Sequence, residues 1–315
     1  NWDSDGDGIS DGDEVLGTTA GLNLPAMGTN PLRKNILIEY DWFDDSNECK
    51  AHSHRPTAAT VNMVAATFAS SPVSNPDGSR GVTVIQDYGQ GGEFRGGNRI
   101  NDADGVIAGG VSDSEFANYR SQNFASNRQG YFHYTLLPHR YNLNGASSGQ
   151  AEIVGDDLVV SLYCAGSDYN VASTIVHELG HNLGLRHGGD TDTNDKPNYN
   201  SVMNYTYQFN GVDTNCTPPG DRVIDYSRGV RISLDEAALD ENKGICGTPS
   251  WDWNENGLIE SSVASDINKD TWFDVLTDHD DWDAIVYDWD AGSRSRLNGR
   301  SATEIATCDS RPPGF

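Results

Sequence analysis

The stretch HELGHNLGLRH, from His177 to His187, constrains this chain more than any other part of its sequence. In an α-helix, residues four apart lie one turn apart on the same face, so His177 and His181 would point in the same direction. Glu178 would lie about 100° round the helix from His177, within reach of a water molecule on a metal ion but not itself a ligand. The pattern therefore predicts a helix that carries a metal site.

The residues around this stretch define the helix. Ser167 or Asp168 can cap a helix that runs from about residue 169 to 183. Gly184 tolerates the left-handed backbone conformation, which would let the chain turn sharply and return His187 to the same point as the other imidazoles. Three apolar residues at helical spacing would bury against a sheet, while the imidazoles face a cleft: Ile175, Leu179 and Leu183.

Three neutral imidazoles with one open position form a catalytic zinc site, whereas structural zinc sites are closed by four protein ligands. Zinc lowers the pKa of a bound water, and Glu178 would take the proton of that water as a general base. A helix whose histidines only pack or face solvent is the alternative. The extended spacing H-E-x-x-H-x-x-G-x-x-H is much more specific than H-E-x-x-H alone, so we predict one catalytic zinc ion held by His177, His181 and His187.

These residues resemble the long zinc-binding consensus of the metzincin metalloproteases at every fixed position. The resemblance implies a Met-turn, a methionine beneath the histidines, and Met203 in YNSVMNYTY is placed for it. Tyr205 stands where astacin-like and serralysin-like members carry a tyrosine that can bind the metal and stabilise the oxyanion; a tyrosine packed under the cleft is the alternative. The helix most resembles those of pappalysin-like members and other secreted bacterial metzincins, although GGD after His187 differs from the pappalysin sequence.

Hydrophobic patterns predict an α/β (α+β) fold built on a mixed, twisted sheet. Strand patterns occupy 35–43, 81–89, 131–137 and 157–164, and a helical pattern occupies 56–71. The metzincin resemblance implies an antiparallel edge strand that binds substrate as an added strand, and 148–157 is the best candidate. We therefore divide the chain into an acidic calcium-binding segment (1–34), a catalytic subdomain with the zinc helix (35–188) and a loop-rich C-terminal subdomain with the Met-turn (189–315).

The opening DSDGDGISDGDE has the oxygen-ligand pattern of an EF-hand calcium loop, and it also resembles a thrombospondin type 3 repeat. A solvated acidic tail is the alternative, but clustered carboxylates without a cation would repel one another. Gly8 falls at the sharp turn of the loop. The predicted ligands are Asp3, Asp5, Asp7, the carbonyl of Ile9, Asp11 and Glu14.

Two later acidic segments fit the calcium pattern less well. The first has Val263 at the last ligand position, and the second has Thr271 where glycine is expected. Either each segment binds calcium imperfectly or the two share ligands around a single ion, so we predict one to three structural calcium ions in all. The candidate ligands are Asp252, Asn254, Asn256, Leu258 and Glu260 in the first segment, and Asp266, Asn268, Asp270 and Asp274 in the second.

The five cysteines lack CxxC spacing, so a cysteine zinc site is not expected. In an exported protein, we expect five cysteines to form two disulfides and to leave one thiol unpaired. Cys216 and Cys246 are the expected pair, and the other pairing cannot be deduced. A thiol outside a disulfide, such as that of Cys308, could reach the zinc ion as an inhibitory ligand, but a disulfide is the favoured expectation for Cys308.

The remaining histidines lack ligand spacing to the predicted helix. His52 and His54 in AHSH could bind a second metal ion, although packing or hydrogen bonding is the favoured role. We expect the same of His133, His139 and His279.

The composition limits the partners of the chain. A net charge of −26 argues against nucleic acid and anionic membranes, because both would repel it. No apolar run approaches the about 20 residues of a membrane helix. The chain starts without methionine, so we expect a processed, secreted protein. We also expect it to be a monomer.

The sequence thus predicts a secreted zinc endopeptidase that is stabilised by calcium and acts on proteins or peptides. One alternative is a calcium-dependent binding or adhesion module with a vestigial or latent zinc site. Another is a zinc hydrolase that acts on a non-protein amide.

Overall fold

The computed structural model describes residues 2–45, 48–102, 104–141, 147–288, 304–309 and 312. The chain forms two compact units, one made of residues 1–184 with 286–315 and the other of residues 185–285. The division by function into 1–34, 35–188 and 189–315 stays a prediction. No described helix is long and apolar enough to cross a membrane.

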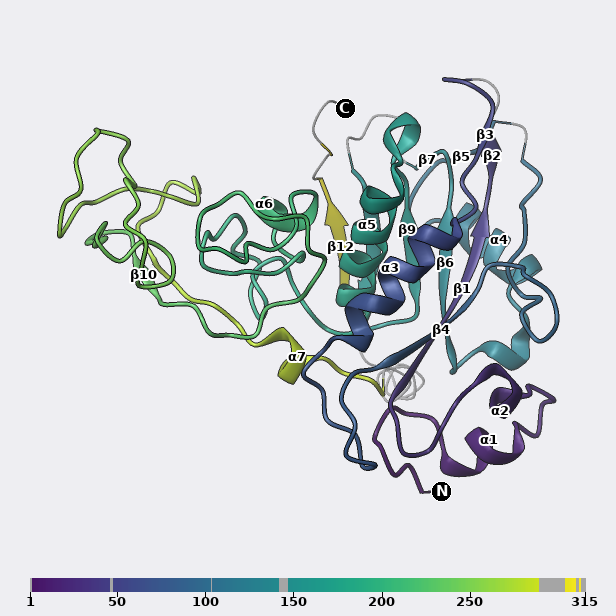
Figure 1. Cartoon of the computed structure of the whole chain (residues 1–315). Coiled ribbons are helices and arrows are strands. Elements are labelled where there is room, and N and C mark those ends of the chain that lie inside the picture. Colours follow the sequence, from purple (N-terminus) through teal and green to yellow (C-terminus); the bar gives the residue numbers. More distant parts are fainter. Residues whose placement is uncertain are drawn as a thin grey trace. The chain divides into compact units, whose positions relative to one another are not determined.

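A six-stranded mixed sheet forms the centre of the first unit, in the order β12-β8-β9-β6-β1-β4 (Figure 1). Four strands run parallel: β1 (Asn35–Trp42), β4 (Thr83–Asp87), β6 (Phe132–Leu137) and β9 (Asp157–Val160). At one side of the sheet, β8 (Gly149–Ile153) pairs antiparallel with β9 and also with the outer strand β12 (Glu304–Cys308). The predicted α/β fold with a mixed sheet is confirmed, and the sheet is mostly parallel.

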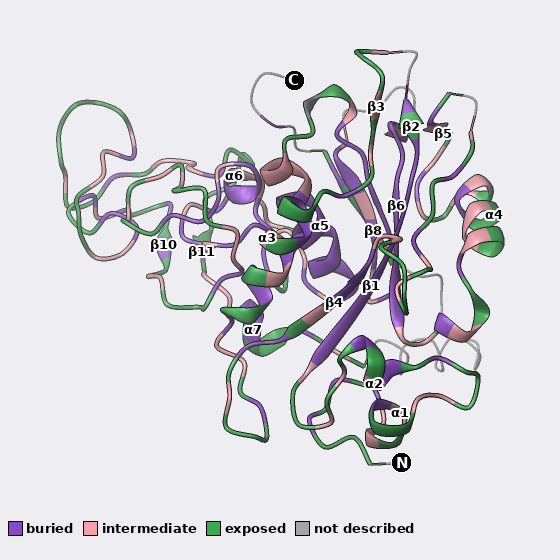
Figure 2. Ribbon diagram, turned by 45° about the vertical axis from the view of Figure 1, so that its right-hand side comes forward, coloured by how far each residue is buried: buried purple, intermediate pink, exposed green. Residues whose placement is uncertain are grey.

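The central strands are covered on both faces. Every residue of β1 and β6 is buried, as expected for parallel strands between two layers (Figure 2). Helices α3 (Ala58–Ala69) and α5 (Asp168–Asn182) lie side by side over one face (Figure 1). Thr57 caps α3, and its hydroxyl also donates a 2.6 Å hydrogen bond to Asp168 in the first turn of α5. Both helices match the predicted ones closely.

The N-terminal segment contributes to the core of this unit. It forms α1 (Asp11–Leu16) and α2 (Leu24–Met27). Ile9 is 4% exposed and belongs to the same hydrophobic cluster as Leu37 of β1 and Phe116 of α4 (Ser114–Asn123). The acidic loop is therefore attached to the main core and is not a solvated tail.

Short elements complete the first unit. His139 lies between β6 and the short strand β7, and Cys49 pairs with Cys164 at a Cα–Cα distance of 6.2 Å. These elements are β2 (Asp44–Asp45), β3 (His52–Ser53), β5 (Val106–Ile107), β7 (Arg140–Tyr141), and the 3-10 turns η1 (Ser126–Arg128) and η2 (Tyr163–Ala165).

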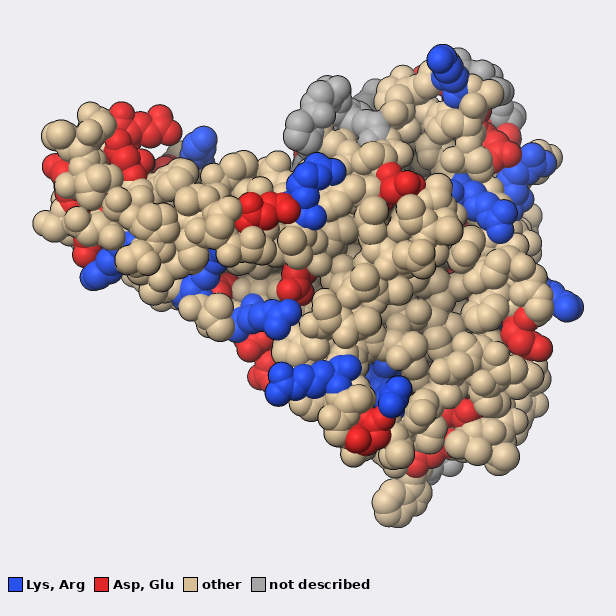
Figure 3. Space-filling model, in the orientation of Figure 1, with Lys and Arg blue, Asp and Glu red and all other residues tan. Residues whose placement is uncertain are grey.

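The second unit consists of short elements joined by loops. A small hydrophobic cluster that includes Leu239, Trp253 and Val263 forms its core. Cys216 and Cys246 form a disulfide with a Cα–Cα distance of 5.9 Å, which confirms the predicted pair. Acidic side chains gather over the loops of this unit (Figure 3). Its elements are α6 (Tyr205–Gln208), β10 (Leu234–Asp235), β11 (Val275–Leu276) and α7 (Asp281–Ala284).

One prediction about the sheet needs correction. The segment 148–157 does contain the antiparallel strand β8, but β8 is not the edge of the sheet. Strand β12 pairs along its outer side, from Glu304 opposite Ile153 to Cys308 opposite Gly149. The backbone groups that we expected to receive an extended substrate are therefore paired with the chain itself.

Candidate metal centre

Helix α5 has the ends that the sequence predicted. The hydroxyl of Ser167 caps it by accepting a 3.2 Å hydrogen bond from the N–H of Asn170. The helix ends at Asn182, and Gly184 follows with φ +98°, a left-handed conformation that suits glycine. The chain therefore turns where the predicted third ligand requires a turn.

Asn182 fixes the end of α5 to the sheet. Its amide donates hydrogen bonds to the carbonyls of Glu152 (3.0 Å) and Asp157 (3.1 Å), the first in β8 and the second in β9. Its side-chain oxygen lies 3.1 Å from Nδ1 of His133 on β6. Burial lowers the pKa of His133 to about 4, so this imidazole is neutral at pH 7. His133 therefore has a hydrogen-bonding role, as expected.

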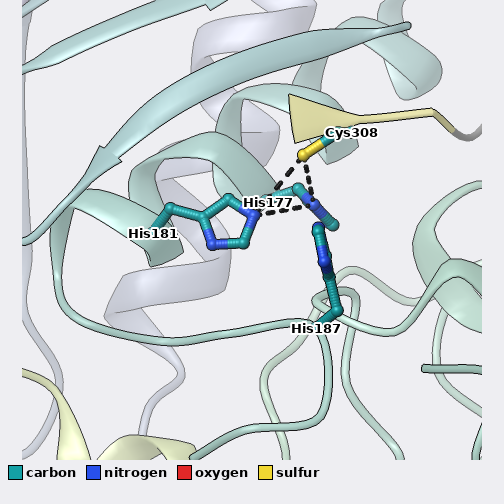
Figure 4. Close-up of side chains that lie close together, drawn as sticks. All are labelled: His177, His181, His187 and Cys308. Carbon is teal, nitrogen blue, oxygen red and sulfur yellow. Dashed lines mark hydrogen bonds between the residues drawn. The ribbon is translucent and has the colours of Figure 1, made fainter. Parts of the chain in front are cut away.

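His177 and His181 point to the same place, with their Nε2 atoms 3.2 Å apart (Figure 4). Two nitrogen ligands of a tetrahedral zinc ion, each at about 2.0–2.1 Å, lie about 3.3 Å apart. Two neutral imidazoles that face each other with their lone pairs repel unless a proton or a cation lies between them. The cluster could hold a metal ion, and its donor set suits zinc.

Cys308, the last residue of β12, supplies a third donor to this cluster. Its sulfur lies 2.9 Å from Nε2 of His177 and 3.4 Å from Nε2 of His181 (Figure 4). It forms no disulfide and is buried, so the favoured expectation of a disulfide for Cys308 is wrong. The alternative expectation, that Cys308 is an inhibitory ligand, placed its thiol beside the imidazoles. The pairing of β12 with β8 explains how the thiol is held there.

We expected the imidazoles of α5 to face a cleft, and this expectation is wrong. His177, Glu178 and His181 are each fully buried, as are Ile175 and Leu179 on the face against the sheet. Strand β12 brings Cys308 over the imidazoles, so both faces of α5 are covered.

The side chain of Glu178 on α5 packs tightly against Gly149, the first residue of β8. Burial raises its pKa well above the usual range, and a hydrogen bond with Cys308 acts in the opposite direction. A Cβ atom on Gly149 would collide with the Glu178 carboxylate, so only glycine leaves room for it. The hydroxyl of Tyr141 donates a 2.6 Å hydrogen bond to the Gly149 carbonyl and holds this backbone in place. The sequence did not single out Gly149, because its contact comes from strand packing.

The other predicted zinc-site residues belong to the second unit, and Figure 4 also draws one of them, His187. The ring of His187 lies 4.7 Å from the ring of Tyr205, centroid to centroid. Met203 is fully buried two residues before Tyr205. Asn204 fixes the turn between them, because its amide donates to the carbonyls of Lys196 (2.7 Å) and Tyr199 (2.9 Å).

The N-terminal acidic loop gathers its carboxylates. One oxygen from each of Asp3, Asp5 and Asp7 lies within 4.8 Å of the others. Glu14 is 1% exposed, with both carboxylate oxygens short of hydrogen-bond donors. Burial, reinforced by neighbouring carboxylates, raises the pKa of Asp5 to about 6, of Asp7 to about 7 and of Glu14 to about 8. Asp11 instead accepts hydrogen bonds from the backbone N–H and hydroxyl of Ser4.

The two acidic segments of the second unit differ from this loop. Asp252 accepts the N–H groups of Asn256 and Gly257, and Asp266 accepts that of Thr271. Within the described chain, neither segment brings three carboxylates within 4.8 Å of one another.

Two buried glutamates that the sequence did not single out organise these segments. Glu241 accepts the N–H groups of Trp253 and Glu260 in the first segment, and Glu236 accepts those of Ile267 and Asp274 in the second. Glu260 in turn accepts from the amides of Asn254 and Asn256, while Asp270 accepts from Asn268, and Leu258 is 64% exposed. Calcium binding by these segments stays a prediction, and the carboxylates already have donors.

Comparison with known proteins adds little. No protein-family model matches the chain, and no curated protein matches it in sequence. Among solved structures, the chain is similar to archaemetzincin from Methanopyrus kandleri, with 16% sequence identity and a TM-score of 0.30, over 55% of this chain and 81% of that one. At this level of similarity the comparison says nothing about function.

Proposed function

We propose that this chain is a secreted zinc endopeptidase of the metzincin type, in which His177, His181 and His187 hold the metal ion. The observation that carries this proposal is the convergence of the His177 and His181 Nε2 atoms, 3.2 Å apart, with Glu178 on the same helix. His187 would be the third ligand, because the left-handed conformation of Gly184 allows a sharp turn three residues before it. Its ring contact with Tyr205 keeps the predicted tyrosine beside the third ligand.

The side chains divide the chemistry of peptide hydrolysis between them. A zinc ion held by the imidazoles supplies a Lewis acid. Glu178 takes the proton of the attacking water and passes it to the leaving amine. The Tyr205 hydroxyl would donate a hydrogen bond to the oxyanion, and Met203 would form the Met-turn that the metzincin resemblance implies. Proteins and peptides are the proposed substrates, and the disulfides Cys49–Cys164 and Cys216–Cys246 favour an oxidising, extracellular compartment.

Replacement of Glu178 tests this mechanism. We expect Glu178→Gln to keep its zinc and to lose about 10²- to 10⁴-fold in peptide cleavage, because only the proton acceptor is removed. Zinc content and cleavage of a casein substrate are the measurements, and Glu93→Gln on the exposed surface is the matched control. Cleavage by Glu178→Gln at the wild-type rate would contradict the proposal.

We propose that Cys308 and β12 keep this enzyme in a latent form. The Cys308 thiol takes the position that a catalytic zinc site leaves open, and β12 takes the side of β8 where an extended peptide would add. In such a form the residues for catalysis are present, and the chain's own strand covers them. Removal of the thiol should then raise activity.

We also propose that the N-terminal loop binds one structural calcium ion. Asp5, Asp7 and Glu14 are buried, and burial raises the pKa of all three carboxyl groups although Lys34 acts in the opposite direction on Asp5. Calcium accepts several carboxylate ligands. Calcium at 100 times its Kd should stabilise the first unit by about 2.7 kcal/mol. Thermal unfolding with and without calcium measures this, and Glu14→Gln should remove the effect while Asp252→Asn keeps it. An equal calcium response in Glu14→Gln would contradict the assignment.

A further inference from the structure

A second group of imidazoles lies in the first unit, on elements other than α5. His52 belongs to β3, His54 follows it, and His139 lies between β6 and β7. One ring nitrogen of each lies within 4.8 Å of the others, and Nε2 of His54 is 2.9 Å from Nδ1 of His139. The three ring centroids are 4.6 to 5.2 Å apart. The imidazoles therefore converge on one point.

The hydrogen bond of His52 fixes which of its nitrogens faces the cluster with a lone pair. Nδ1 lies 2.7 Å from the carbonyl oxygen of Lys50. A carbonyl only accepts, so Nδ1 carries the hydrogen and Nε2 keeps its lone pair in the neutral ring. That Nε2 atom is buried and receives no hydrogen bond from any described residue. A buried acceptor that lacks a donor destabilises the folded protein.

His139 is oriented in the same way by a carboxylate. Its Nε2 lies 3.3 Å from Glu48 and 3.9 Å from the buried Asp45, so this nitrogen donates and Nδ1 keeps its lone pair. Metal-binding histidines usually donate their other ring N–H to a carboxylate or a backbone carbonyl, which fixes the tautomer. His52 and His139 show one of each.

Hydrogen bonds alone cannot satisfy every ring nitrogen of this cluster, because one acceptor nitrogen lacks a donor. If Nε2 of His54 carries a hydrogen, it serves Nδ1 of His139 at 2.9 Å, and Nε2 of His52 still has no donor. One cation among three neutral imidazoles would satisfy all three lone pairs.

We propose that His52, His54 and His139 form a second metal site, separate from the α5 cluster, that binds a zinc-class divalent ion. Imidazole ligands favour zinc, copper or nickel over calcium or magnesium. Asp45 and Glu48 balance the charge from outside the ligand shell. A cavity of about 120 Å³, lined in part by His52, His54 and Tyr163, gives an entry path and room for a fourth ligand. The ion would tie β3 to the chain between β6 and β7.

Zinc counting on single variants tests this site independently of peptidase activity. The protein is loaded with zinc sulfate in calcium-containing buffer, desalted and analysed for metal per chain. We expect two zinc ions in the wild type, one in His54→Ala and one in His181→Ala, with none in the double variant. His279→Ala is the matched control, because His279 lies outside the cluster near Asp190, and it should keep two.

The outcomes separate this inference from the proposed function. If His54→Ala binds as much zinc as the wild type, the second site is absent, whatever His181→Ala shows. If His54→Ala loses one zinc and His181→Ala loses none, the second site stands and the proposed α5 site fails.

A second measurement keeps the inference testable if His54→Ala does not fold. In the His181→Ala background, zinc should raise the melting temperature, and the milder His52→Gln change should abolish that rise. An undiminished rise in the protein with both changes would overturn the inference.

Discussion

The two histidine clusters of this chain arise in different ways. His177 and His181 lie one turn apart in α5, so their convergence follows from helix geometry alone. His52 and His139 lie far apart in the sequence and meet only because β3 and the end of β6 are neighbours. A metal site within one element can therefore be predicted from spacing, whereas one assembled by a sheet requires the fold.

The clusters also differ in what completes them. Cys308 stands beside His177 and His181 as a further donor, while the other cluster is backed by the Lys50 carbonyl and the Glu48 carboxylate. The first arrangement resembles a reactive site that is closed, and the second resembles a structural site that is held from outside. The predictions below act on this difference.

Gly149→Ala should have the largest effect, and it should act on the α5 cluster alone. A Cβ atom at this position collides with Glu178. Displacement of the proposed catalytic carboxylate by about 1 Å should lower peptide cleavage about 10²-fold without changing zinc content. Steady-state kinetics and zinc analysis measure the two effects, with Gly12→Ala, where the same atom meets no close neighbour, as the control. Unchanged kinetics would place Glu178 outside the chemistry.

Cys308→Ser should have the opposite sign. If the closed arrangement holds nine-tenths or more of the molecules, removal of the thiol should raise peptide cleavage about tenfold or more. The same change should leave the zinc affinity of the His52, His54 and His139 cluster unaltered. Thr307→Ser in the same strand is the control. A Cys308→Ser enzyme that is no faster than the wild type would remove the thiol from the latency mechanism.

His133 provides the smallest test, because it is a buried histidine outside both clusters. Its pKa is about 4 in the folded protein, against 6.5 as its ordinary value. Its contribution to stability is therefore complete above pH 6.5 and is lost as the pH falls towards 4, by about 1.4 kcal/mol per pH unit. Urea unfolding from pH 7.5 to 4.5 should show a weaker pH dependence in His133→Gln. Equal slopes in both proteins would contradict the burial argument.

Much of the fold was predictable because hydrophobic periodicity is local. The strands β1, β4 and β6 and the helices α3 and α5 fall within a few residues of their predicted bounds. Capping by Ser167 and the turn at Gly184 were predictable for the same reason, since each depends on one residue type at a helix end. The predicted zinc-binding motif could likewise be recognised from local spacing.

The features that the sequence could not provide depend on contacts between distant segments. The pairing of β12 with β8 has no signal in residues 304–308 alone, so the covered strand could not be predicted, and the position of Cys308 beside the imidazoles was only the less favoured alternative. Glu236 and Glu241 were missed because buried carboxylates that accept backbone N–H groups have no fixed spacing. For Asp11, spacing suggested a ligand, but hydrogen bonds to Ser4 hold its carboxylate.

The most direct test of the account is peptide cleavage by zinc-loaded Cys308→Ser protein, with and without a zinc chelator, beside the same protein that also carries Glu178→Gln. We predict cleavage that the chelator abolishes and added zinc restores, and none above background in the Glu178→Gln partner. Zinc-loaded Cys308→Ser protein that cleaves no peptide, or cleavage that persists without Glu178, would contradict the account.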